Sequence, residues 1–305
     1  MHRFLALSAA SLSIAASAHA ADIYATNLND YATAPLSGQF AWIGAGGTWA
    51  ASGSTNSPFQ PASVVGPGVN PGIDPVGGRG KMVRLCTEKF NGGRTKAWLD
   101  LAGSGKWAAA SVGGNTVLET RVKMYVPGGQ TVTSTFGVMI SKSAAETSGG
   151  FLVSAQTGAI SLLNGGYASS NRIATGAAAP LNTWNEYVYR WNVATGEGKL
   201  ILNGSTIATH TTTLSGSVYA SNLFATTDVA PGTANAFGFF DDLSLAAVSP
   251  SVPCTGDLNG DGQRDASDLA FMLGAWGTAG GDVNGDGTTD ASDLAVLLGG
   301  WGACL

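Results

Sequence analysis

Two acidic segments near the end of the chain have the residue types and spacing of a calcium loop. Residues 257–268 read DLNGDGQRDASD and residues 282–293 read DVNGDGTTDASD, with an offset of 25 residues. Hard oxygen donors at alternate positions wrap a chain around one Ca²⁺. An acidic turn without a metal is the alternative, which the repetition disfavours. The predicted ligands of two Ca²⁺ ions are Asp257, Asn259, Asp261, the Gln263 carbonyl, Asp265 and Asp268, then Asp282, Asn284, Asp286, the Thr288 carbonyl, Asp290 and Asp293.

An amphipathic helix is predicted after each loop. Apolar residues fall at i, i+3, i+4 and i+7 in both, as Leu269, Met272, Leu273 and Trp276, and as Leu294, Leu297, Leu298 and Trp301. Gly262 and Gly287 stand where a calcium loop turns sharply, and Gly277 and Gly302 stand where a left-handed helix end is expected. We expect the two stripes to bury each other in an antiparallel pair with a pseudo-two-fold axis. Because Cys254 and Cys304 bracket this small unit, we expect a disulfide between them.

Duplicated D-x-N-x-D-G loops with Asp at position twelve resemble type I dockerins. The resemblance implies a cohesin-type partner module, a role in polysaccharide degradation, and partner selection by Ala266, Ser267, Ala291 and Ser292. Identical residues in the two repeats imply two bound orientations. The chain departs from the family in its short offset, in Arg264 and Thr289 at position eight, and in its Trp-Gly helix ends.

The charge separates this tail from the rest of the chain. Residues 254–305 hold eight Asp and one Arg, whereas residues 22–253 hold 12 acidic and 13 basic side chains. An acidic tail on a nearly neutral body argues against nucleic acid and anionic membranes as partners. Residues 1–20 have the basic start, the apolar run and the Ala-His-Ala end of a secretory signal. The sequence thus predicts a secreted chain without a membrane span, with a body over 21–248, a Pro/Ser linker over 249–253 and a dockerin-like domain over 254–305.

The body is predicted to be an antiparallel β-sandwich. Short runs of alternating apolar and polar residues lie between turn signals, and Gly128-Gly129, Asn164-Gly165 and Asn203-Gly204 supply hairpin turns. The predicted strands cover residues 81–87, 117–126, 135–141, 150–155, 159–163, 185–192, 198–202 and 236–245.

Three segments of the body resemble the laminin G-like branch of the concanavalin A-like lectin/glucanase sandwiches, which have a jelly-roll fold. They are residues 27–42, 184–207 and 236–245. The resemblance implies a glycan-binding role, and it implies a further structural Ca²⁺ at Asp241 or Asp242. A capping Asp at a sheet edge is the alternative there. Trp49 and Trp107, in Gly/Ala/Ser-rich segments, are the candidate glycan-binding residues, since sugar rings stack on exposed aromatic faces.

The residues of the body do not form a recognisable catalytic motif. Its five Glu are scattered, and the E-x-D-x-x-E strand of the family's glucanases is absent. Glu119 is interpreted as a surface residue with cross-strand partners, and His210 as an exposed strand residue. We expect a non-catalytic glycan- or surface-binding protein. The alternatives are a glycoside hydrolase or polysaccharide lyase carried on a dockerin, and a structural surface or adhesion protein.

Overall fold

The computed structural model describes residues 21–34, 36, 49–52, 62–67, 80–88, 93–143, 146–212, 216–229, 235–250, 255–259 and 263–303, with the backbone alone at 49–52 and 229. The proposed signal segment, most of the linker, Asp261, Gly262, Cys254 and Cys304 lie outside these residues.

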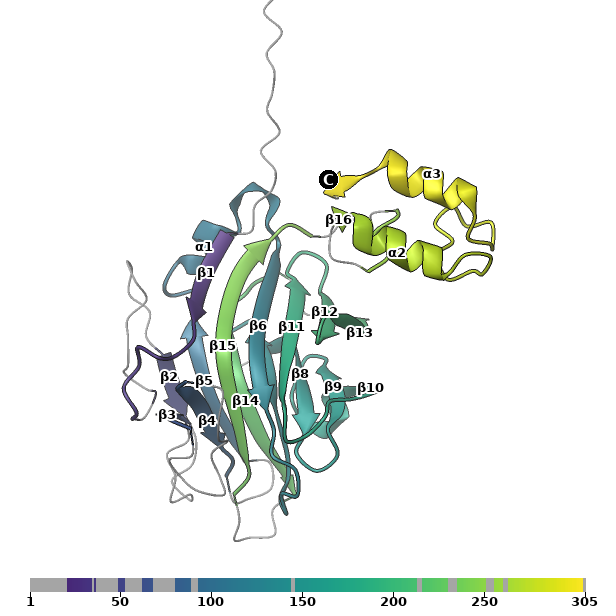
Figure 1. Ribbon diagram of the computed structural model, residues 1–305. Helices are drawn as coiled ribbons and strands as arrows, with labels where there is room; N and C mark the ends of the chain where they lie inside the picture. The colour runs from purple at the N-terminus through teal and green to yellow at the C-terminus, as the bar shows by residue number, and fades with distance from the viewer. Residues whose placement is uncertain are drawn as a thin grey trace, which may run out of the picture.

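The body consists of two antiparallel sheets packed face to face (Figure 1), which confirms the predicted mainly β sandwich. Across the eight-stranded first sheet run β13 (Ser205–Thr211), β12 (Glu197–Leu202), β11 (Trp184–Asn192), β6 (Val117–Tyr125), β15 (Phe237–Val248), β4 (Met82–Cys86) and β3 (Ala62–Val65), and β1 (Ala21–Thr26) also pairs with β15. Across the seven-stranded second sheet run β10 (Arg172–Ala178), β9 (Ala159–Leu163), β8 (Thr147–Ser154), β7 (Thr133–Ser141), β14 (Ala220–Val229), β5 (Arg94–Asp100) and β2 (Trp49–Ser52).

The core lies between the two sheets because each strand alternates its side chains. In β6, Leu118, Val122 and Met124 are fully buried, whereas Glu119 and Arg121 lie on the opposite face. The largest fully buried side chains come from both sheets and include Trp191, Tyr187, Tyr189, Phe136, Phe151, Phe224, Phe239 and Phe240. Removal of these aromatic faces from water is the main term that favours the sandwich.

All eight predicted strand segments coincide with strands. The turn between β12 and β13 is Asn203-Gly204, with φ of 48° and 85°, as a two-residue hairpin turn requires. Short helical segments, α1 (Lys106–Ala110), η1 (Val112–Gly114) and η2 (Ser169–Asn171), complete the body.

The tail contains two nine-residue helices, α2 (Ala266–Gly274) and α3 (Ala291–Gly299), which run in opposite directions (Figure 1). A short ladder joins β16 (Gln263–Arg264) to β17 (Gly302–Ala303). Met272 and Leu297 are fully buried, as predicted. The rest of the stripe prediction is wrong in part, because Leu273, Trp276, Leu298 and Trp301 are each about half exposed.

Candidate functional site

Three carboxylates of the second predicted calcium loop converge on one point. One oxygen from each of Asp282, Asp286 and Asp293 lies within 4.8 Å of the others. They hold loop positions one, five and twelve, which supply side-chain ligands in a calcium loop. Three carboxylates this close repel one another in the absence of a cation. The donor set, hard oxygen atoms only, fits Ca²⁺.

The backbone of this loop holds Asp282 in place. Its Oδ1 accepts hydrogen bonds from the N–H groups of Gly285 at 2.6 Å and Asp286 at 3.2 Å, and its Oδ2 accepts one from Gly287 at 2.7 Å. Gly285 and Gly287 have φ of 84° and 96°, a left-handed backbone that side chains disfavour. The sharp turn predicted at Gly287 is therefore confirmed.

Asp293 is the buried carboxylate of the second loop. Its side chain is fully buried, and its carboxylate accepts N–H groups from Asp290 at 2.8 Å, Val283 at 2.9 Å and Asn284 at 3.1 Å. These bonds, the one from Asp290 first, lower the pKa of the Asp293 carboxyl. A buried carboxylate that stays ionised is ready to bind a cation.

Asp290, at position nine, has a second role as the N-cap of α3. Its carboxylate accepts the Ser292 N–H at 2.7 Å and the Ser292 hydroxyl, which together lower its pKa. Position nine of a calcium loop often reaches the ion through a water molecule, so this role is compatible with calcium binding. The Thr288 backbone, at position seven, donates to Asp286 Oδ1 at 3.0 Å.

The first loop repeats the pattern at position twelve. Asp268 is fully buried and accepts N–H groups from Leu258 at 2.7 Å, Asp265 at 2.9 Å and Asn259 at 3.1 Å. Asp261 lies outside the described residues, so the ligand set of this loop stays a prediction. Asp257 lies near Lys199 of β12. Burial and the neighbouring Arg190 lower the pKa of Lys199, and the negative charge of Asp257 acts in the opposite direction.

The predicted partner-binding residues all lie on the surface of the tail. Ala266, Ser267, Ala291 and Ser292 are exposed in the first turns of α2 and α3. Five large apolar side chains of these helices and their ends are between 46% and 53% exposed, namely Phe271, Leu273, Trp276, Leu298 and Trp301. The tail thus exposes large apolar side chains from both of its repeats.

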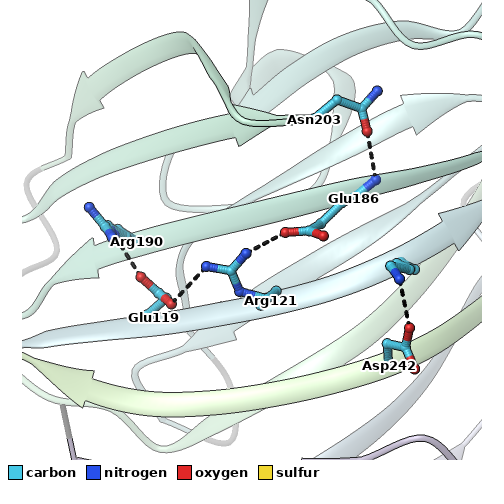
Figure 2. Close-up of polar contacts among 7 residues, drawn as sticks. Glu119, Arg121, Glu186, Arg190, Asn203 and Asp242 are labelled. Carbon is cyan, nitrogen blue, oxygen red and sulfur yellow. Dashed lines mark hydrogen bonds and ion pairs between the residues drawn. The ribbon is translucent and has the colours of Figure 1, made fainter. Parts of the chain in front are cut away.

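A chain of ion pairs crosses the outer face of the first sheet (Figure 2). Arg190 Nε lies 2.7 Å from Glu119 Oε2, and Arg121 bridges Glu119, at 3.6 Å, to Glu186. This confirms the cross-strand interpretation of Glu119 and gives Glu186 a partner that the sequence did not reveal. Both carboxylates are thus engaged by guanidinium groups.

Asp242 and Asp241 lie at a bulge in β15. Asp242 has a φ of 46° and its Oδ2 lies 2.9 Å from Lys123 Nζ (Figure 2), while the buried Asp241 accepts the Asp242 N–H at 2.8 Å. Among the described residues, neither belongs to a converging group of acidic side chains. The third Ca²⁺ stays a prediction.

The candidate tryptophans do not lie in exposed loops. Trp107 is in α1, half-buried and packed against the core, and its glycan-binding role stays a prediction. Trp49 begins β2 in register with Leu99 of β5. Trp98, which the sequence analysis did not single out, is half-buried on the outer face of the second sheet, with Lys96 Nζ 4.7 Å from its ring centroid.

His210 is half-buried, not exposed as expected. Its Nε2 lies 3.0 Å from the hydroxyl of the buried Tyr189, and its ring lies 6.4 Å from that of Trp191. Burial raises the pKa of Tyr189 and lowers that of His210. Gly198 permits this contact, because a Cβ there would lie 2.3 Å from His210 Nε2.

No helix of the described residues has the length and apolar character needed to cross a membrane.

No protein-family model matches the sequence, and no curated protein matches it. Solved structures with a similar fold include the conserved carbohydrate esterase of Shiga toxin-encoding bacteriophage phi24B, at 14% identity, a TM-score of 0.45 and coverage of 76% of this chain and 100% of that one. Domain 4 of AbnA, a GH43 extracellular arabinanase from Geobacillus stearothermophilus, matches at 15% identity, TM-score 0.41 and coverage of 75% and 93%. Alginate lyase vAL-1 from Chlorella virus matches at 12% identity and a TM-score of 0.42, with coverage of 65% of this chain and 93% of that one. At these values the likenesses do not assign a function.

Proposed function

We propose that this chain is a secreted, calcium-binding protein of two parts, in which the sandwich binds a glycan or a glycan-bearing surface and the dockerin-like tail docks it to a cohesin-type or other surface module. The convergence of Asp282, Asp286 and Asp293 carries the proposal. Ca²⁺ relieves the repulsion among these carboxylates and fixes the start of α3, and the matching Asp268 supports a second ion in the first loop.

The tail has a surface suited to docking once the loops are filled. Ser267 and Ser292 lie at equivalent exposed positions of the two helices, and so do Trp276 and Trp301 beyond the helix ends. A pseudo-two-fold surface of this kind offers a partner two equivalent orientations. Aromatic side chains and a few polar groups are also what interface centres contain.

Calcium binding is tested by calorimetry on the full chain. We expect two Ca²⁺ per chain, one fewer in Asp293→Asn, and none in the double variant Asp268→Asn/Asp293→Asn. Asp100→Asn is the matched control, because Asp100 caps a turn of the sandwich through the Gly103 N–H at 2.7 Å. If the native chain binds a third Ca²⁺ and Asp242→Asn does not, the additional ion lies at Asp242 in the sandwich.

Docking is tested by surface plasmon resonance against a panel of cohesin modules, with Ca²⁺ and with chelator. We expect binding only with Ca²⁺, weakened by Ser267→Asp/Ser292→Asp. Full Ca²⁺ stoichiometry in the Asp293→Asn variant would contradict the calcium proposal. Calcium binding without docking to any module would leave the calcium site standing and overturn the cohesin-type partner.

A further inference from the structure

Three large side chains of β5 lie on the outer face of the second sheet. Ala97 and Leu99 point into the core and are buried, so the alternation of a strand places Arg94, Lys96 and Trp98 on the opposite face. Arg94 is exposed, and Lys96 and Trp98 are half-buried. This face thus carries two cations and an indole ring in one row along the strand.

Both cations lie against aromatic rings. Lys96 Nζ lies 4.7 Å from the Trp98 ring centroid, and Arg94 Cζ lies 5.4 Å from that of Tyr167. The Arg94 guanidinium also donates to the Tyr167 hydroxyl. Tyr167 in turn packs on Phe224 of β14, with 5.2 Å between the ring centroids. Trp98 and Tyr167 are both half-buried, so part of each ring remains accessible.

The loop that carries Tyr167 is fixed to the sheet. Arg172 binds the Asp228 carboxylate through two hydrogen bonds of 2.6 Å and 2.7 Å, and its Nε donates to the Tyr167 carbonyl at 2.9 Å. A bidentate guanidinium–carboxylate pair is strong and directional. The Tyr167 ring is therefore held in place before any ligand arrives, which reduces the entropy cost of binding.

The two cations of β5 lack a carboxylate partner among the described residues, unlike three cations of the first sheet. Arg121, Lys123 and Arg190 all form ion pairs there. On the second sheet Asp228 is engaged by Arg172, and the Glu88 carboxylate accepts the backbone N–H of Arg94 at 3.1 Å, not its guanidinium. Asp100, at the end of β5 on the same face, accepts the Gly103 N–H at 2.7 Å. Burial and the nearby Arg94 lower the pKa of Lys96, as expected for a cation without a counter-charge.

We propose that Arg94, Lys96, Trp98 and Tyr167 form a binding site for an acidic polysaccharide, with the cations pairing with its carboxylate or sulfate groups and the rings stacking on its sugar faces. The inference rests on the proposed glycan-binding role of the sandwich and specifies the class of glycan. Because two adjacent cations contribute, binding weakens as salt concentration rises.

The test is affinity electrophoresis and calorimetry of the full chain with matched pairs of polysaccharides. Polygalacturonate is compared with its methyl ester, and dextran sulfate with dextran, so that each pair differs in charge on one backbone. We expect binding only to the charged member of at least one pair. Lys96→Met and Arg94→Gln each weaken binding about tenfold, as expected for the loss of one charge-assisted bond, and Trp98→Ala weakens it as well.

Lys123→Met is the matched control, because it removes an ion-paired cation from the outer face of the other sheet. Circular dichroism and the melting temperature show whether each variant is folded. We expect Lys96→Arg, which keeps the positive charge, to retain binding. Equal binding of charged and neutral members, or equal weakening by Lys123→Met, would overturn the inference and leave glycan binding intact. Failure of the chain to bind any of these polysaccharides or a further panel of neutral ones would overturn both the acidic-polysaccharide site and the proposed glycan-binding role of the sandwich.

Discussion

Thr289 donates its backbone N–H to the Thr278 carbonyl at 2.6 Å, and so joins the second calcium loop to the segment that follows α2. The Thr289 carbonyl accepts the Gly277 N–H at 2.9 Å. The equivalent contact in the other half of the tail pairs Arg264 of the first loop, which corresponds to Thr289, with Gly302 after α3, which corresponds to Gly277. Each predicted calcium loop is thus bonded to the end of the other repeat, and the Trp-Gly ends that depart from the dockerin pattern carry these bonds.

We predict that the two calcium loops bind cooperatively. In Asp268→Asn the first loop loses its buried ligand, and the bridge from Arg264 to Gly302 should loosen with it. Since the ends of both helices depend on these bridges, the second loop should lose at least about fivefold in Ca²⁺ affinity, a typical coupling between linked sites. Calorimetric titration of the full chain measures this.

The control for cooperativity is Asp257→Asn, which removes a predicted ligand at the start of the first loop, whereas Asp268 accepts the N–H of Asp265, the residue next to Arg264. We expect a smaller effect of this variant on the second loop. Unchanged affinity at the second loop in Asp268→Asn would contradict cooperative binding.

We predict that Met272 stabilises the tail and that its neighbour Leu273 does not. Met272 is fully buried, and Gly281 approaches it so closely that a Cβ there would lie 3.2 Å from Met272 Cα. Met272→Ala should cost about 2 to 5 kcal/mol. Because folding and calcium binding are coupled, Ca²⁺ affinity should fall by about thirtyfold or more.

Leu273→Ala is the matched control, because that side chain is 53% exposed. Its effect on stability should be about 0.5 kcal/mol or less. Equal losses of Ca²⁺ affinity in the two variants would show that the burial of Met272 is not what stabilises the tail.

The sequence predicted the strands whose two faces differ clearly in polarity. In β6 the apolar Leu118, Val122 and Met124 alternate with Glu119 and Arg121, so the period of two is visible. In β14 the adjacent Leu223 and Phe224 are both apolar and both buried, because Tyr167 covers the outer face there. This local cover removes the alternation, and β14 was not predicted.

The convergence of Asp282, Asp286 and Asp293 was predictable because these residues are close in sequence. The surface around Arg94 was not, because Arg94 and Tyr167 are 73 residues apart and meet only after β5, β14 and the loop before β10 come together. The exposure of Leu273 was missed for a different reason. A helical stripe shows which face is apolar, but the contacts of the folded helix decide how much of that face is covered. Of the apolar residues of α2 and α3, only Met272 and Leu297 are fully buried.

We predict that Cys254 and Cys304 form a disulfide when the chain is secreted. A bridge would close a loop of about 50 residues, and the chain-entropy model gives such a loop a few kcal/mol. Peptide mapping after alkylation without reductant should find the two cysteines joined. Cys86, buried with its Sγ 3.6 Å from the Thr87 carbonyl, is the internal reference and should become alkylated only after unfolding. Alkylation of Cys254 and Cys304 in the folded chain would contradict the prediction.

His210 should make the stability of the sandwich depend on pH. Burial lowers its pKa below the usual 6.5 in the folded state, so the unfolded chain binds the proton more readily. The free energy of unfolding contributed by this residue is therefore fully present above about pH 6.5 and is lost as the pH falls towards the folded-state pKa. Urea unfolding at pH 7.5 and 5.5 should show a larger loss of stability in the native chain than in His210→Gln, which keeps a polar side chain near Tyr189 without titrating. Because Tyr189 is fully buried and bonded to His210 Nε2, protonation of the ring also places a charge next to the core. The same loss of stability in both proteins would assign the pH dependence to other groups and contradict this role of His210.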